Sequence, residues 1–179
     1  MLALIAALTF VLLARAFRSI VLALKALLLN LLSLAATFGV MTWFWQQGHG
    51  SSALFGTPAT GAITFWIPLM VFAFLFGLSM DYEVFLLSRM REEYDLVPDN
   101  TRAVSTGLAR TGKLITSAAV IMVIAFGGLA ASRFIEMQEF GFGLAAAILI
   151  DATIIRAVIV PSLMKLMGRV NWWLPRMAR

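Results

Sequence analysis

The chain has 179 residues, of which 61% are hydrophobic and 13% are charged. Soluble domains are roughly 45–50% apolar and about 25% charged, so this composition excludes an ordinary soluble protein and indicates an integral membrane protein. The net charge of +5 does not indicate nucleic-acid binding, because the basic residues gather at the ends of apolar segments, where they set membrane orientation. The absence of cysteine excludes disulfides and thiol chemistry.

Five apolar segments are predicted to be membrane spans, each of which ordinarily needs about 20 mostly apolar residues. The first, residues 1–14, is short, and we interpret it as the end of a span whose beginning is missing. The predicted fold is all-α, a single polytopic transmembrane helical bundle over residues 1–179. The other four spans are predicted at residues 20–45, 63–88, 114–131 and 140–167.

The distribution of Lys and Arg predicts the orientation. The segment 46–62, between the second and third spans, has no Lys or Arg. Basic residues favour the cytoplasmic side, so we expect a plasma-membrane protein with its N-terminus outside and its C-terminus in the cytoplasm. The basic residues between the third and fourth spans and after the fifth are Arg89, Arg91, Arg102, Arg110, Lys113, Lys165, Arg169, Arg176 and Arg179.

Two features near the expected cytoplasmic side lead to local predictions. Asp99 is suited to cap a helix, and the mixed apolar and basic residues 102–113 that follow predict a short surface helix. Lys25 lies inside the second span close to its cytoplasmic end, and we expect its long side chain to extend to the lipid headgroups.

An acid follows a long uncharged stretch in the third span. Residues 65–80 carry no charge and lead directly to Asp81, Tyr82 and Glu83. An ionised carboxylate within a span costs at least about 2.5–3.5 kcal/mol, so it is retained mainly where it has a function or a partner. We therefore predict that Asp81 relays protons, with the Tyr82 hydroxyl as a donor to a carboxylate. Glu83 points away from Asp81 on a helix and is expected to be an exposed or interfacial acid.

The last span holds two further charges, Asp151 and Arg156. Five residues on an α-helix correspond to a separation of about 140°, so they are not expected to form an ideal pair on one helix. With Glu83 they are candidate supporting charges, and a purely structural charge cluster remains an equally open interpretation. Pro68 and Pro161 are expected to kink the spans that contain them.

The chain shows no motif of an enzyme. There is no Gly-x-Ser-x-Gly, no His-Glu-x-x-His and no phosphate-binding glycine loop with its lysine. The one histidine, His49, lies in a Gly/Ser-rich loop. We therefore expect a protein that is not an enzyme, without a catalytic, cofactor or metal site.

Several stretches resemble one known family, the MmpL transporters of the resistance-nodulation-division superfamily. The resemblance rests on FGLSMDYEVFLLSRMREE at 76–93, GLARTGKLITSAA at 107–119, DATIIR at 151–156, VP at 160–161 and NWWLP at 171–175. It implies that the chain is the last five helices of the second of two six-helix halves. It also implies that Asp81 and Tyr82 supply one of the two Asp-Tyr pairs of a proton relay.

The partners that this resemblance implies are the lipid bilayer, protons, the missing N-terminal half and a substrate that is a lipid or another small hydrophobic molecule. Nucleic acid is not expected. Two alternatives remain open at this point. The first is a non-transporting membrane module that binds lipid, similar to sterol-sensing domains, and the second is an inactive remnant.

Overall fold

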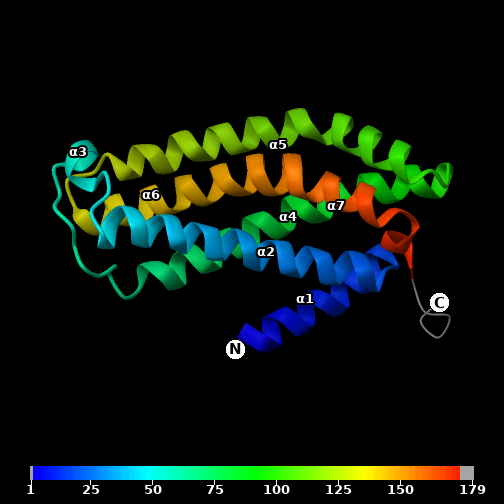
Figure 1. The fold of residues 1–179 in the computed structure, drawn as a ribbon, viewed down its shortest axis with the longest axis horizontal. Coiled ribbons are helices and arrows are strands. Elements are labelled where there is room, and N and C mark those ends of the chain that lie inside the picture. Colours follow the sequence, from blue (N-terminus) through cyan, green and yellow to red (C-terminus); the bar gives the residue numbers. More distant parts are fainter. Residues whose placement is uncertain (1, 174–179) are drawn as a thin grey trace.

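The structure is a computed structural model that describes residues 2–173, with side chains from residue 4 onward. Its long helices lie side by side along one axis (Figure 1). Some residues used in the predictions of the first span, the orientation and the family resemblance lie outside the described residues. They are Met1, Leu174, Pro175, Arg176 and Arg179.

The chain is helical almost throughout the described range. The α-helices are α1 (Leu2–Phe17), α2 (Ile20–Met41), α3 (Ser51–Phe55), α4 (Ile67–Leu96), α5 (Asn100–Ala130), α6 (Ile135–Leu149) and α7 (Val160–Met167). Two π-helices, η1 (Thr42–Gln46) and η2 (Ile150–Ile159), continue α2 and α6, and the 3₁₀-helix η3 (Gly168–Trp172) follows α7. The predicted all-α membrane bundle is thereby confirmed.

Within the described residues, four helical stretches are long and apolar enough to cross a membrane. They correspond to the last four predicted spans, and α1 is a shorter apolar helix. Most of the helices extend beyond the predicted spans, because polar residues continue a helix past the apolar stretch that a membrane would cover. The helix of the third span begins later than predicted, at Ile67 rather than residue 63, and that of the fourth ends at Ala130. The four stretches are Ile20–Gln46, Ile67–Leu96, Asn100–Ala130 and Ile135–Trp172.

The start of α5 confirms one prediction and corrects another. The Asp99 side chain accepts hydrogen bonds from the N–H groups of Thr101 at 2.8 Å and Arg102 at 3.3 Å, as expected of a helix cap. The separate surface helix predicted at 102–113 is wrong, because the helix that starts there runs without interruption to Ala130. No residue in that stretch forces the helix to end. Its one candidate helix breaker near the middle, Gly107, is part of α5 and packs closely against Met90 of α4.

Small residues bring the long helices close together. A Cβ added to Gly141 of α6 would lie 2.4 Å from the backbone nitrogen of Ala130 and 2.6 Å from the carbonyl oxygen of Phe126. A Cβ added to Gly107 of α5 would lie 2.5 Å from Cγ of Met90 in α4. Small residues at such crossings are typical of helix packing in membranes.

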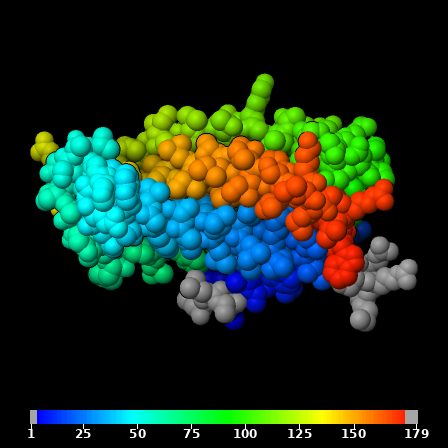
Figure 2. Space-filling model, in the orientation of Figure 1, coloured from blue at the N-terminus to red at the C-terminus, as the bar shows by residue number. Residues whose placement is uncertain are grey.

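The interior contains a large apolar cluster toward the α1–α2 connection and a smaller one toward α3, formed by Met41, Ile67, Val71 and Leu144. Figure 2 shows α2, α6, η2 and α7 packed side by side on one face of the molecule. The outward sides of the helices also carry many large apolar residues, among them Leu28, Leu69, Ile121 and Ile124. Apolar side chains that face outward on membrane-length helices are expected to contact lipid.

Pro68 lies at the start of its helix, whereas Pro161 lies inside a continuous helical stretch, Ile135–Trp172. Pro68 lies in the first turn of α4, where the missing N–H would have no helical partner in any case. Pro161 lies in the first turn of α7, directly after η2. The helical stretch therefore continues through Pro161, with the wider π-helical geometry in the turns directly before it.

Candidate functional site

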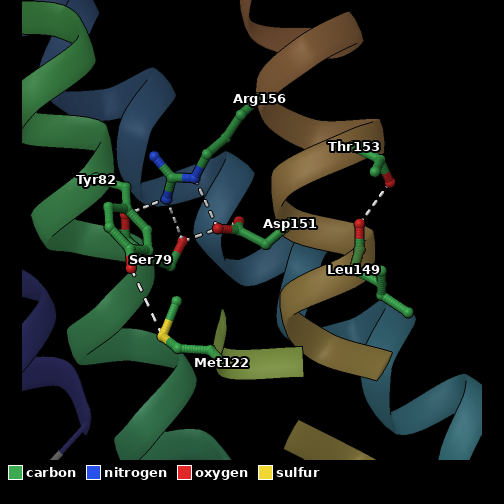
Figure 3. A network of polar contacts seen from close by, with 7 residues as sticks. All are labelled: Ser79, Tyr82, Met122, Leu149, Asp151, Thr153 and Arg156. Carbon is green, nitrogen blue, oxygen red and sulfur yellow. Dashed lines mark hydrogen bonds and ion pairs between the residues drawn. The ribbon is translucent and has the colours of Figure 1, made fainter. Parts of the chain in front are cut away.

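Three side chains form a buried polar network between α4 and η2 (Figure 3). Arg156 Nε donates to Asp151 Oδ2 at 2.7 Å, and both residues are at most 4% exposed. Ser79 Oγ donates to Asp151 Oδ1 at 3.0 Å, and Arg156 Nη2 donates to Ser79 Oγ at 2.8 Å. Arg156 Nη2 also donates to the Ser79 carbonyl oxygen. The ion pair of η2 is thus fixed to α4 by one serine.

The Asp151–Arg156 pair corrects the prediction that these residues do not pair on one helix. That prediction assumed α-helical geometry. Residues 150–159 form a π-helix instead, and the N–H of Val160 donates to the carbonyl of Ile155, five residues earlier. In a π-helix the neighbours along the axis are i and i+5, which is the spacing of Asp151 and Arg156. Pro161 follows immediately and cannot donate a backbone hydrogen bond, so a regular α-helix would lose a bond at this point.

Tyr82 lies beside the network. The guanidinium carbon of Arg156 is 5.7 Å from the centre of the Tyr82 ring, a cation–π arrangement. The Tyr82 hydroxyl points to Sδ of Met122 in α5, 3.6 Å away (Figure 3). The structure therefore brings Tyr82, Asp151 and Arg156 together, as a site that includes all three requires.

Asp81 is turned away from this network. It is exposed on the outer side of α4, on the same side as the exposed residues Ala73 and Gly77. A Cβ added to Gly77 would meet no atom within 4 Å. Asp81 therefore does not face the interior of this bundle, and none of the described residues packs closely at Gly77.

Glu83 is buried, at 3% exposure, so the expectation of an exposed or interfacial acid is wrong. Glu83 does point away from Asp81, as predicted. It follows Ser79 by four residues and so lies on the inward side of α4, in the same buried stripe as Leu86, Leu87 and Met90. Its charge lies within electrostatic range of Arg156, Asp151 and Lys25.

Lys25 does not extend to the headgroups as expected. It is 6% exposed, and its Nζ donates to Asn171 Oδ1 at 2.9 Å and contacts Met164 Sδ. Asn171 belongs to η3, which folds back on the end of the bundle. Asn171 Nδ2 donates to the carbonyl oxygens of Met164 at 2.7 Å and Gly168 at 2.8 Å. Lys25 is thus inside the bundle because a partner distant in sequence satisfies its ammonium group.

Ser79, Asn171 and three buried polar residues of α2, Asn30, Ser33 and Thr37, are not among the site residues predicted from the sequence. In α2, Lys25, Asn30, Ser33 and Thr37 are all buried and lie three to five residues apart. That spacing places polar groups along one side of an apolar helix, a signal that was present in the sequence. Over residues 4–173 no group of three or more His, Asp or Glu side chains is arranged to hold a metal ion.

Comparison with known proteins adds independent information. The model of the MMPL family matches residues 1–179. The chain is 44% identical over 171 residues to the trehalose monomycolate exporter MmpL3 of Mycobacterium tuberculosis, covering 96% of this chain and 18% of that protein. It is 42% identical over 176 residues to the heme uptake protein MmpL11 of the same organism, covering 96% of this chain and 18% of that one.

A membrane protein of Streptomyces coelicolor is 41% identical over 170 residues, covering 95% of this chain and 24% of that protein. The chain therefore spans about a fifth of the length of the curated relatives that it matches. Since the family model covers every residue of the sequence, this chain belongs to the MMPL family.

Proposed function

We propose that this chain is part of a proton-driven exporter of lipids or other small hydrophobic molecules in the plasma membrane. Two of the relatives support this function by name, because the MmpL3 proteins of Mycobacterium tuberculosis and Mycolicibacterium smegmatis are trehalose monomycolate exporters. Within this function Asp81 carries the proton and Tyr82 positions it. Asp151 and Arg156 hold Tyr82 in place.

The observation that carries the proposal is the position of Asp81. It is an exposed acid in a helix long and apolar enough to cross a membrane, and its neighbours on the same side are small or apolar. A carboxylate that faced lipid there would cost at least about 2.5–3.5 kcal/mol. The acid therefore needs a protein partner on this side of α4. A second helical bundle with its own Asp-Tyr pair, as the family resemblance implies, would supply that partner.

The proposed mechanism follows from the charge of this acid. When Asp81 binds a proton it becomes neutral, and the cost of placing it between apolar helices falls. The two bundles then prefer a different packing from the one they adopt around a charged acid. The Asp151–Arg156 pair stays charged through this step, so the guanidinium group of Arg156 continues to hold the Tyr82 ring in place.

Replacement of Asp81 by asparagine tests the relay. In an MMPL transporter that contains this segment, we expect Asp81→Asn to abolish proton-driven export, because the amide has nearly the same shape and cannot carry the proton. The matched control is Glu92→Gln, which neutralises an acid with 57% side-chain exposure. Membrane insertion should be normal in both variants. Export near the wild-type rate by Asp81→Asn would contradict the proposal.

The proposed orientation has the N-terminus outside and the C-terminus in the cytoplasm. Its support is that the α1–α2 connection, the α4–α5 connection and the end of α7 lie at one end of the bundle (Figure 1). Arg15, Arg18, Arg91 and Arg102 belong to this end, where positive charge favours the cytoplasm. A reporter fused after Trp173 should be active only as a cytoplasmic fusion. A periplasmic signal would reverse the direction proposed for the protons.

A further inference from the structure

The interior of the bundle contains polar atoms that have no hydrogen-bond partner. Five of these atoms belong to four residues of α2, α4 and η2: Glu83 Oε1, Arg156 Nη1, Ser33 Oγ and both side-chain amide atoms of Asn30. All four residues are at most 3% exposed. A buried polar group left without a partner costs about 1–3 kcal/mol, and native proteins usually satisfy such groups with bound water. Several of them in one region indicate a place for water rather than isolated defects.

The helix register places these residues next to one another. A Cβ added to Gly143 would lie 2.8 Å from Met41 Sδ and 3.3 Å from Val71 Cγ2, so α2, α4 and α6 meet at that level. Eight residues further along each helix, about 12 Å at 1.5 Å per residue, are Ser33, Ser79 and Asp151. The hydrogen bond of 3.0 Å between Ser79 and Asp151 confirms that this extrapolation holds for two of the three helices.

The same register continues toward the other end of the bundle. Asn30 of α2 and Glu83 of α4 lie one further turn along, and both are on the inward side of their helices. Beyond them comes Lys25, whose ammonium group reaches Asn171 of η3. The polar residues therefore form a column from Arg156 in the middle of the bundle to Lys25 near its end. Helix α2 packs against α4 and η2 along this column.

We propose that this column is a binding site for a chain of water molecules and that Glu83 is a proton-binding site on it, separate from Asp81. Glu83 and Asp81 are two residues apart on one helix and therefore point in nearly opposite directions, about 200° apart. A proton passes from a protonated water to Glu83 Oε1, which becomes a neutral carboxylic acid. It then leaves to the next water toward Lys25, and the carboxylate is restored.

The charges that face Glu83 come from two elements. They are Lys25 of α2 and the pair Asp151 and Arg156 of η2. Helices α5, α6 and α1 also pack against α4. Arg110 of α5 is paired with Glu93, Glu139 of α6 accepts a hydrogen bond from the N–H of Thr64 before the start of α4, and Arg15 of α1 is exposed. A carboxylate between two cations and one acid, with a free oxygen, is suited to accept and release a proton. The role of this step in transport rests on the proposed function, whereas the existence of the site does not.

Infrared difference spectra between low and high pH, recorded on the whole chain in lipid nanodiscs, test the site. We expect a carboxylic-acid band from Glu83 that shifts in D₂O, because the group is in contact with water. Glu83→Gln should remove this band, while Asp81→Asn and the exposed control Glu92→Gln should leave it in place. Asn30→Leu and Ser33→Ala should shift it, because each removes a group that holds water next to Glu83.

A second measurement requires no substitution. Incorporation of ¹³C-labelled glutamate into the unaltered chain should shift the band, which assigns it to a glutamate even where a variant fails to fold. A band that persists in Glu83→Gln, or that the label does not shift, would overturn the proton site. A band that is unmoved by both Asn30→Leu and Ser33→Ala would overturn the water column. Neither result depends on transport, so failure of this inference is distinguishable from failure of the Asp81 relay.

Discussion

The two sides of α4 hold acids in opposite surroundings. Asp81 is exposed on a side that no other described helix covers at Gly77, whereas Glu83 is buried on the side that faces α2 and η2. Ser79, on the same side as Glu83, is bonded to both members of an ion pair. One helix therefore contributes to a bonded ion-pair network on the side that faces its own bundle, and it leaves Asp81 uncovered on the other side. Asp81 and Glu83 are only two residues apart, but on a helix they point in nearly opposite directions, so they can have different roles.

The largest expected effect comes from breaking the ion pair between Asp151 and Arg156 on the inward side of α4. Arg156→Met leaves Asp151 buried without its cation, and loss of one partner of a buried pair typically destabilises by about 3–5 kcal/mol. We expect a loss of that order in the free energy of unfolding, measured in mixed micelles. The double variant Asp151→Leu with Arg156→Met removes both charges and should recover most of it. Equal stability of the single variant and the wild type would show that the network does not hold η2 to α4.

Two glycines distinguish the inward side of α4, which other helices cover, from its open side, which no described residue covers at Gly77. Gly107 packs on Met90, and a Cβ there would lie 2.5 Å from Met90 Cγ and 3.1 Å from Met90 Cα. Gly107→Ala should therefore destabilise the chain by about 1–3 kcal/mol through overpacking.

Gly77→Ala is the matched change on the open side of α4. In the chain alone we expect no loss of stability, because its Cβ meets nothing within 4 Å, and helix propensity favours alanine by up to about 1 kcal/mol. In an MMPL transporter that contains this segment, the same change should reduce export, since the added methyl group would obstruct the partner helix beside Asp81. Normal export by Gly77→Ala would show that no helix packs closely there.

The smallest expected effect is that of Tyr82→Phe. Tyr82 lies on α4 between the open side of Asp81 and the inward side of Glu83. It removes one weak contact to Met122 at 3.6 Å and retains the ring beneath Arg156. We expect a stability change of about 0.5 kcal/mol and a partial loss of export, well short of that caused by Asp81→Asn. Complete loss of export in Tyr82→Phe would mean that the hydroxyl group itself carries the proton.

The sequence predicts the helices well because long apolar segments bounded by charge leave few alternatives in a membrane. The Asp99 cap and the all-α fold follow from residue type alone. The surroundings of single side chains do not follow in this way. Lys25 is buried because Asn171, far away in sequence, accepts its hydrogen bond. Glu83 is buried because Ser79 fixes which side of α4 faces η2, and no local property of Glu83 determines this.

The Asp151–Arg156 pair shows a different limit of prediction. An angle of about 140° follows correctly from α-helical geometry, but the segment is a π-helix. Periodicity of apolar residues cannot reveal this, because the outward-facing side of η2 is apolar in either form. Pro161 was the available signal, since a missing backbone donor favours a local change in hydrogen bonding in the turn before it.

The π-helix also determines how many residues the last span must contain. Over Ile150–Ile159 the chain advances less per residue than an α-helix would, so η2 contains residues that a regular helix of the same length would not. Deleting one residue there without a change in the hydrogen-bond pattern would rotate everything after it by about 100°. Met164 and Asn171 would then turn away from Lys25, and the end of the bundle would lose its closing contact. Chain length in this segment is therefore as constrained as residue identity, and an alignment gap within it would be a structural change rather than a neutral one.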